Sequence, residues 1–209
     1  EMPYANDGSI TYENVIKRFN TDLVNNLGNL VKRTLDMQKK YFDKVIQSPA
    51  QPCELDGELR DACVKAYRGV VENMEAFRIA DALECIFEML SRANKYIDET
   101  TPWTLAKDET KRERLGTVLY NLLEAIRFGA VLLKPFIPET AEEILTLLAT
   151  DEKGYDTVNS ADKFGALKAG EVVGDSRVMF ARVDEEKMLA ELEAEMAAKR
   201  AAAEAAAKA

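Results

Sequence analysis

The chain has 209 residues, 47% of them hydrophobic, which is enough to bury one core, as one domain or one domain with an appendage. Its net charge of -9 argues against a general nucleic-acid binder, because the mean field would repel phosphates. With no histidine and three scattered cysteines, Cys53, Cys63 and Cys85, the sequence argues against a zinc site or a Cys/His nucleophile and fits a reducing cytosol.

The chain is expected to begin with an extended lead-in and to continue as a long helix. Residues 1 to 10 hold a proline and an Asn-Asp-Gly turn signal but little periodicity. Thr11 is placed to cap the first helix, whose apolar periodicity runs to about Phe42 or Ile46. Two prolines shortly afterwards end the helical pattern.

The stretch from Arg18 to Arg33 in this helix has an unusual polar face. Asparagines stand where a solvated helix normally carries Glu and Lys, although asparagine is a mediocre helix former. The run therefore indicates a face that hydrogen-bonds something. Gly28 also costs helix stability, which indicates close approach of another helix or a ligand. The apolar residues of the stretch are Phe19, Leu23, Leu27, Leu30 and Val31, and its asparagines are Asn20, Asn25, Asn26 and Asn29.

Two further amphipathic helices follow the prolines. The apolar spacing predicts one over residues 58 to 77 and the next over residues 79 to 97. Residues 98 to 103 break the pattern, because Pro102 disfavours helix both for itself and for its predecessor. Trp103, the only tryptophan, is therefore expected in the corner that leaves the third helix.

The remaining chain contains two helices, a loop, a strand and a tail. Helices are predicted over about Lys111–Leu133 and from Pro138 through Leu148, where the proline suits a first helical turn. Residues 150–174 are rich in Gly, Asp and Lys and indicate a loop. The alternation in Arg177–Val183 predicts a strand. From Asp184 onward, Glu, Ala, Lys and Met without a sustained apolar stripe indicate a solvated helix or tether.

Asn29 and Arg33 form the sharpest candidate site. Four residues apart on a helix, an amide and a planar guanidinium share one face and can together grip the edge of a base. Single-stranded RNA loops are read in this way. The local charge suits RNA, since seven cations face four anions between Thr11 and Ser48. The alternative is an interhelical hydrogen bond or cap for Asn29 and a surface ion pair for Arg33.

Trp103 is the second candidate. It would serve as a stacking platform for one base, which is worth about 1 to 3 kcal/mol when removed. The alternative is a large residue that plugs the end of the core, because tryptophan is usually highly buried.

No catalytic centre, metal site or membrane segment is expected. The carboxylates form no isolated pair in an apolar setting, and Gly165 and Gly170 lack the spacing of a nucleotide cradle. No uninterrupted apolar run approaches the roughly 20 residues that cross a bilayer, and no basic-then-apolar leader is present. The sequence thus favours binding over catalysis.

Three blocks of the sequence resemble the C-terminal anticodon-binding domain of methionyl-tRNA synthetases. They are RFNTDLVNNLGNLVKR, SRANKYIDETTPWTLAKDE at Ser91 to Glu109, and LLKPFIPETAEEI at Leu132 to Ile144. Their order and spacing match that family over nearly the whole chain to about Val183. Other class I synthetases have a related bundle, but the first two blocks are most similar to the methionyl type.

The resemblance implies an all-α, antiparallel helical bundle over residues 1–183, with the short C-terminal strand, and an Ala/Glu/Lys-rich tail over residues 184–209. It also implies that the bundle recognises the CAU anticodon of methionine tRNA. The family's Asn and Arg on the first bundle helix, and its Trp after Pro, fall on Asn29, Arg33 and Trp103. Asn25 and Asn94 occupy motif positions too, where they either touch RNA or brace the site.

The resemblance further implies a fragment of a cytoplasmic methionine-tRNA ligase. The family's Rossmann half, its two ATP-site motifs and its zinc-binding cysteines, which precede this domain, are not in the chain. The parent would use ATP and Mg, whereas this part needs no cofactor and meets an N-terminal catalytic domain. Some members continue through a similar tether into a small tRNA-binding β-barrel. The rival functions are a helical scaffold that docks on a protein, the anticodon domain of another class I synthetase, and an independent hydrolase, which the missing histidine disfavours.

Overall fold

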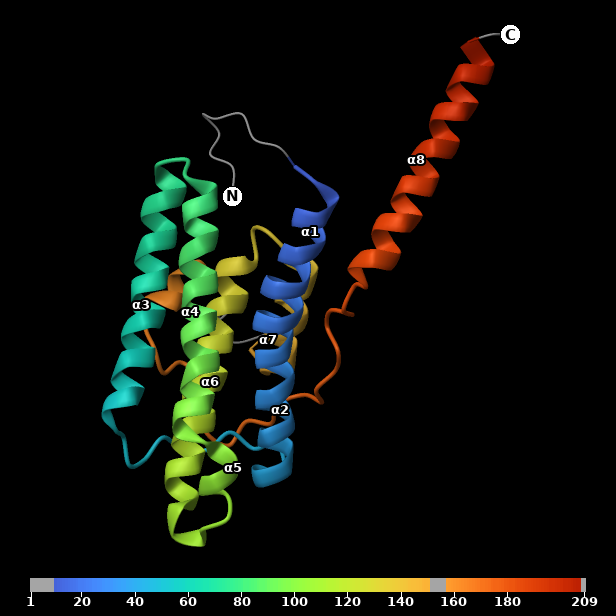
Figure 1. Ribbon diagram of the computed structural model, residues 1–209. Helices are drawn as coiled ribbons and strands as arrows, with labels where there is room; N and C mark the ends of the chain where they lie inside the picture. Colours follow the sequence, from blue (N-terminus) through green and yellow to red (C-terminus); the bar gives the residue numbers. More distant parts are fainter. Residues whose placement is uncertain (1–9, 151–156, 208–209) are drawn as a thin grey trace.

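The computed structural model describes residues 10–150 and 157–207 and confirms an all-α helical bundle (Figure 1). The expected lead-in lies outside the described residues up to position 9, as do residues 151–156 of the expected loop. The elements are α1 (Tyr12–Arg18), the π-helix η1 (Phe19–Gly28), α2 (Asn29–Phe42), α3 (Glu54–Glu75), α4 (Ile79–Thr100), α5 (Pro102–Leu105), the 3-10 turn η2 (Glu109–Lys111), α6 (Arg112–Leu133), α7 (Pro138–Leu147), the 3-10 turn η3 (Val158–Asp162) and α8 (Glu185–Ala207).

Helix α6 forms the centre of the bundle. Every residue from Leu115 to Leu133 is buried, and α2, α3, α4, α5 and α7 all contact this helix. Residues 109–133 are long and apolar enough to cross a membrane, with a mean hydropathy of 1.3 over the most apolar window, but that window is 100% buried inside the protein. Because this helix is enclosed on all sides, it is apolar all round, as expected for a helix in the core of a globular protein.

The first helix has the expected extent but not the expected geometry. Thr11 caps it, since its hydroxyl accepts a hydrogen bond from the N–H of Asn14 at 3.3 Å. The helix then continues without a break through α1, η1 and α2, and ends at Asp43 in a left-handed conformation. Residues 19–28 wind as a π-helix, which amphipathic periodicity did not predict. Such wide turns are rare and concentrate at functional sites.

The middle helices lie close to their predicted positions. Helix α3 begins four residues earlier than expected, because the Asp56 carboxylate accepts a hydrogen bond from the N–H of Cys53 at 2.8 Å and so caps the helix. Helix α4 ends at Thr100, its C-cap Thr101 is left-handed with φ of 43°, and Pro102 begins α5. Trp103 therefore lies in the corner after the third long helix, as predicted.

The strand predicted for residues 177–183 is wrong. Residues 175–183 instead form an extended strap along the outside of the first helix, and it pairs with no other strand of the described chain. Within the described residues, the only β-type pairing is a single bridge between Val45 and Val172. Alternating apolar residues fit a strand only where another strand satisfies the backbone, and here the strap meets helix side chains.

Polar contacts fix the beginning of the strap to α2. Asp175 accepts hydrogen bonds from Lys39 at 2.9 Å and Lys44 at 2.7 Å, and these bonds lower the pKa of Asp175 to about 2. Ser176 donates a hydrogen bond to Asp36. After the strap, α8 leaves the bundle as a projecting helix whose described side chains are mostly exposed (Figure 1).

A buried ionic network joins α3, α4 and α6. Arg114 donates to both carboxylate oxygens of Asp56, at 2.6 and 2.8 Å, and Tyr96 donates to the same carboxylate. Asn121 in turn donates to the Tyr96 hydroxyl at 3.2 Å. Burial of Asp56 opposes its ionisation, but the bonds from Arg114, Tyr96 and Cys53 hold its pKa below the usual value.

A second buried pair fixes the loop around η3 to the centre of the bundle. Glu124 and Arg127 are fully buried on α6 and pair at 2.9 Å. Glu124 also accepts from the N–H groups of Gly165 and Leu167, at 2.9 and 2.6 Å. Arg127 donates to the carbonyl oxygens of Ser160 and Lys163 and to the Ser160 hydroxyl. The loop thus supplies the partners that buried charges require.

Replacement of Asp56 tests the α3–α4–α6 network. Asp56→Asn should lower the free energy of unfolding at pH 7 by about 3 to 5 kcal/mol, because Arg114 keeps its charge without a carboxylate partner. Urea unfolding measures this, with the exposed Asp61→Asn on the same helix as the control. The folded pKa is depressed, so the stabilisation is present above the unfolded pKa of about 4 and disappears as the pH falls through the folded pKa. An equal difference between wild type and Asp56→Asn at pH 7 and pH 3 would contradict this assignment.

Candidate functional site

Asn29 and Arg33 lie on successive turns at the start of α2, where Asn29 is exposed and Arg33 is half-buried. The Asn29 side chain is exposed and makes no hydrogen bond to any residue that the structure describes. Its amide therefore offers both a donor and an acceptor to a ligand. Neither an interhelical bond nor a cap accounts for this asparagine, in contrast to the alternative that the sequence left open.

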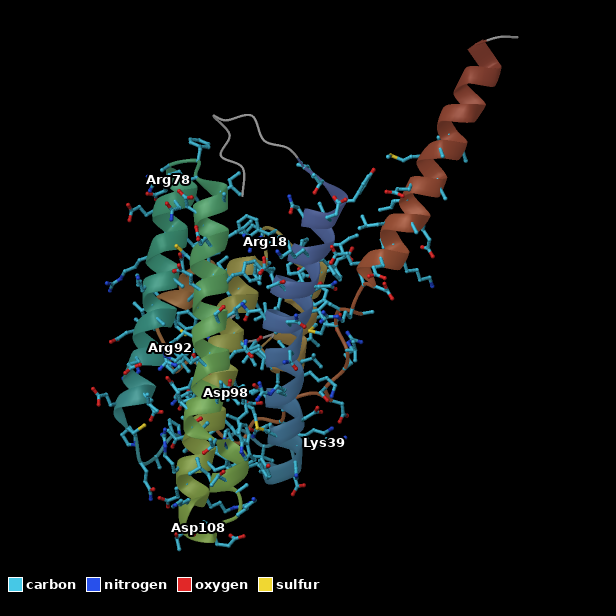
Figure 2. All side chains as sticks on the ribbon, in the orientation of Figure 1. Arg18, Lys39, Arg78, Arg92, Asp98 and Asp108 are labelled. Atoms are coloured by element: carbon cyan, nitrogen blue, oxygen red, sulfur yellow. The ribbon has the colours of Figure 1, made fainter. Side chains whose placement is uncertain are left out.

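Arg33 makes the surface ion pair that the sequence left open as its alternative, and its partner on α4 is a residue that sequence reasoning did not single out. One of its terminal nitrogens lies 3.5 Å from a carboxylate oxygen of Asp98, whose side chain is 69% exposed. Figure 2 labels Asp98 on α4, beside the first helix. The only signal in the sequence was its position in the DETTPW break, five residues before Trp103. A long, exposed pair is worth less than about 1 kcal/mol, so Arg33 can exchange Asp98 for a ligand at little cost.

Trp103 presents an aromatic surface to solvent. It belongs to α5, the short helix that begins at the buried Pro102, and its own exposure is 42%. Such exposure does not fit a plug at the end of the core and leaves the indole available for stacking. Among the described residues, no hydrogen bond or ion pair joins Trp103 to Asn29 or Arg33. Arg33 reaches α4 through Asp98, which precedes Trp103 by five residues in the sequence.

The neighbouring asparagines hold the first helix in place. Asn26 donates to the carbonyl oxygen of Phe87 at 3.2 Å and to the Ser91 hydroxyl at 2.9 Å. Asn94 donates to the backbone and side-chain oxygens of Asn26, at 3.2 and 2.9 Å. Asn94, which the sequence left as either an RNA contact or a brace, is thus half-buried and engaged within the protein. These bonds lock η1 onto α4.

The other two asparagines of the face contact the strap. Asn20 is buried and exchanges two hydrogen bonds with the backbone of Val183, at 2.8 and 2.9 Å. Asn25 remains exposed while its side-chain oxygen accepts from Arg182 at 3.2 Å. Asn25 therefore makes a contact within the protein while its side chain stays accessible. Among the described asparagines of this face, Asn29 alone has a side-chain amide that makes no hydrogen bond within the protein.

A groove of about 980 Å³ separates η1 from α4. Its lining is acidic, with Asp22, Asp81, Glu84 and Glu88 against a single cation, Arg18, which pairs with Asp22 at 3.2 Å. Figure 2 labels Arg18 and Asp98 along the strip between α4 and the first helix. Within the described residues, no group of three or more Cys, Asp or Glu side chains is placed to hold a metal ion.

Comparisons with known proteins agree on one family. Residues 49–201 match the model of the anticodon binding domain of methionyl tRNA ligase. The chain is 47% identical over 192 residues to a methionine–tRNA ligase of Clostridium acetobutylicum, covering 92% of this chain and 29% of that protein. It is 41% identical over 194 residues to the Bacillus subtilis protein of the same name, covering 91% of this chain and 29% of the relative.

Solved structures give the same result. The apo form of Mycobacterium tuberculosis methionyl-tRNA synthetase superposes with a TM-score of 0.81 at 34% identity, over 88% of this chain and 37% of that chain. The complex of that enzyme with methionyl-adenylate also gives 0.81, at 33% identity over 87% and 35% of the two chains. The chain therefore spans between 29% and 37% of the length of these relatives and solved structures.

Two alanine substitutions separate bracing from exposed asparagines. Asn26→Ala should lower the free energy of unfolding by about 1 to 3 kcal/mol, because it removes the hydrogen bonds that the Asn26 side chain makes with Phe87, Ser91 and Asn94 of α4. Asn29→Ala should change it by no more than about 0.7 kcal/mol, in the stabilising direction, since alanine is the better helix former. Chemical denaturation measures both. Equal losses for the two variants would mean that Asn29 is a structural residue.

Proposed function

Because the chain belongs to the family of anticodon-binding domains of methionyl-tRNA ligases, we propose that it recognises the CAU anticodon of methionine tRNA. The observation that carries this proposal is the uncommitted amide of Asn29, one turn from the weakly held guanidinium of Arg33. Both groups stand on a helix that is fixed by hydrogen bonds on its two sides. A site on a rigid element holds its contacts in the geometry that recognition requires.

The chemistry of the two side chains suits a cytosine at the first anticodon position. The Watson–Crick edge of cytosine presents an amino donor beside two acceptors. Asn29 supplies one acceptor and two donors, and Arg33 supplies planar donors in a fixed fork. A base with a different edge would leave polar groups unpaired after losing water, at a cost of about 1 to 3 kcal/mol each.

Trp103 would hold a base by its face while the polar residues read its edge. Unstacked bases in RNA loops gain affinity from aromatic side chains. The indole is already exposed in the free protein, so no core rearrangement is needed for stacking. In this arrangement, Arg33 would leave Asp98 to bind the base, and no other ion pair of the site would need to break.

The parent protein is proposed to be a cytoplasmic methionine-tRNA ligase. The matched relatives carry that name, and the chain spans about 30% of their length. Activation of methionine with ATP and Mg would take place in a catalytic domain N-terminal to this bundle. A tRNA-binding β-barrel after the helical tail is a further partner in this proposal. In such an enzyme the bundle directs aminoacylation by selecting the tRNA.

A stem-loop RNA with a CAU anticodon tests the proposed function. The chain should bind it more tightly than the same stem-loop with the first base changed to guanine. Arg33→Ala should reduce this preference about tenfold, because a paired contact to a base edge is worth about 1 to 3 kcal/mol. Fluorescence anisotropy with labelled RNA at fixed salt measures both affinities.

The matched control is Arg68→Ala, which removes the same charge from an exposed position on α3. Arg68→Ala should leave the preference for CAU unchanged. No preference in the unaltered chain, or equal effects of the two arginine variants, would favour a protein-docking scaffold over anticodon recognition.

A further inference from the structure

The exposed stripe of Asn25 and Asn29 has two flanks of opposite charge. On the α4 side, the groove carries the four carboxylates of Asp22, Asp81, Glu84 and Glu88, and Asp98 lies beyond it. On the strap side stand Arg182 and Lys32, of which Lys32 pairs with Asp36. Arg182 donates a hydrogen bond to the neutral side-chain oxygen of Asn25, so this contact does not neutralise its charge. Phosphates are drawn to cations, and RNA bound at Asn29 is therefore directed over the strap.

The strap side contains a hollow beside Asn29. It has a volume of about 250 Å³ and lies between η1, the first turn of α2 and the middle of the strap. Its lining residues are Val24, Asn25, Gly28, Asn29, Lys32, Val178, Met179 and Phe180. Each of the two exposed asparagines of the stripe contributes to its rim.

Gly28 sets the depth of this hollow. A Cβ at position 28 would stand 3.2 Å from the Phe180 ring and 3.0 Å from the Leu23 carbonyl oxygen. The glycine thus lets Phe180 lie directly against the helix. Phe19 holds that ring in place from the side, edge to face with centroids 5.9 Å apart. The helix and strap therefore form a fixed apolar floor.

The lining selects a flat, small ligand with a polar edge. Four apolar side chains form the walls, while the Asn25 and Asn29 amides and the Lys32 ammonium stand at the rim. Pockets that hold drug-sized ligands measure roughly 300 Å³ or more, so this one suits a single ring system. Val178 at its edge is 68% exposed, so a ligand in the hollow would meet its side chain.

We propose that this hollow holds an unstacked nucleobase of the bound RNA loop, different from the first anticodon base. The proposal rests on the proposed function, because it needs RNA at Asn29. Bases in protein-bound loops are splayed apart and packed on apolar and aromatic side chains. Asn29 stands between the two positions, with Arg33 and Asp98 on one side and the strap on the other. One helix would thus separate two neighbouring bases.

The test combines a protein variant with base removal from the RNA. Val178→Glu places a charge at the edge of the hollow, and Val172→Glu is its control, at another exposed valine, which pairs with Val45 away from Asn29. Each nucleotide of the CAU stem-loop is replaced in turn by an abasic one. Val178→Glu should weaken binding of the intact loop about tenfold, and Val172→Glu much less.

Removal of one base other than the first anticodon base should weaken binding by the unaltered chain about tenfold. The same removal should not weaken binding by Val178→Glu any further. The second base site would be overturned if the effect of Val178→Glu depended on the first anticodon base alone, or on no base of the loop. Equal weakening by the two glutamates would overturn it as well, since a general charge effect would suffice. These results differ from failure of the proposed function, in which the unaltered chain would not distinguish CAU from a changed first base. Both valines are exposed, so thermal unfolding of the two variants should agree.

Discussion

The complete burial of α6 is the constraint on which the rest of the structure depends. Because every residue from Leu115 to Leu133 is enclosed, the surrounding helices must cover this helix on all sides. Its two buried charges, Glu124 and Arg127, also fix the loop around η3, because the described part of that loop donates hydrogen bonds to Glu124 and accepts them from Arg127. The first helix is part of this cover. Its inner face is committed to the core and the strap covers part of its outer face, which leaves the stripe of Asn25 and Asn29 exposed for recognition.

Some asparagines on the polar face of the first helix hold that helix in place, and Asn29 is left to bind a base. Asn26 joins the helix to α4 and Asn20 joins it to the strap, so the segment is fixed from both sides. Asn29 is left with an uncommitted amide, and Arg33 with a partner that is easily exchanged. A rigid frame with a few unsatisfied polar groups binds at a lower entropic cost than a mobile one. Asn20 and Asn26 lie in the π-helical turns, whereas Asn29 and Arg33 lie in the regular α-helix that follows them.

Sequence reasoning predicted the features that depend on local chemistry. Apolar periodicity located the helices, and Pro102 located the corner that carries Trp103. It missed what depends on contacts between distant segments. The strap has the alternation of a strand but pairs with Asn20 and Asp36 of a helix. The π-helix is likewise invisible to an apolar pattern, and the pairing of Arg33 with Asp98 joins residues 65 positions apart.

Shielding of the single tryptophan tests the central claim, anticodon reading by Asn29, Arg33 and Trp103, most directly. Trp103 is 42% exposed, so acrylamide should quench its fluorescence readily in the free chain. Titration with a CAU stem-loop should protect the indole at RNA concentrations at which the stem-loop with a changed first base gives no protection. Equal protection by the two RNAs, or binding of the CAU loop without protection of Trp103, would contradict the claim.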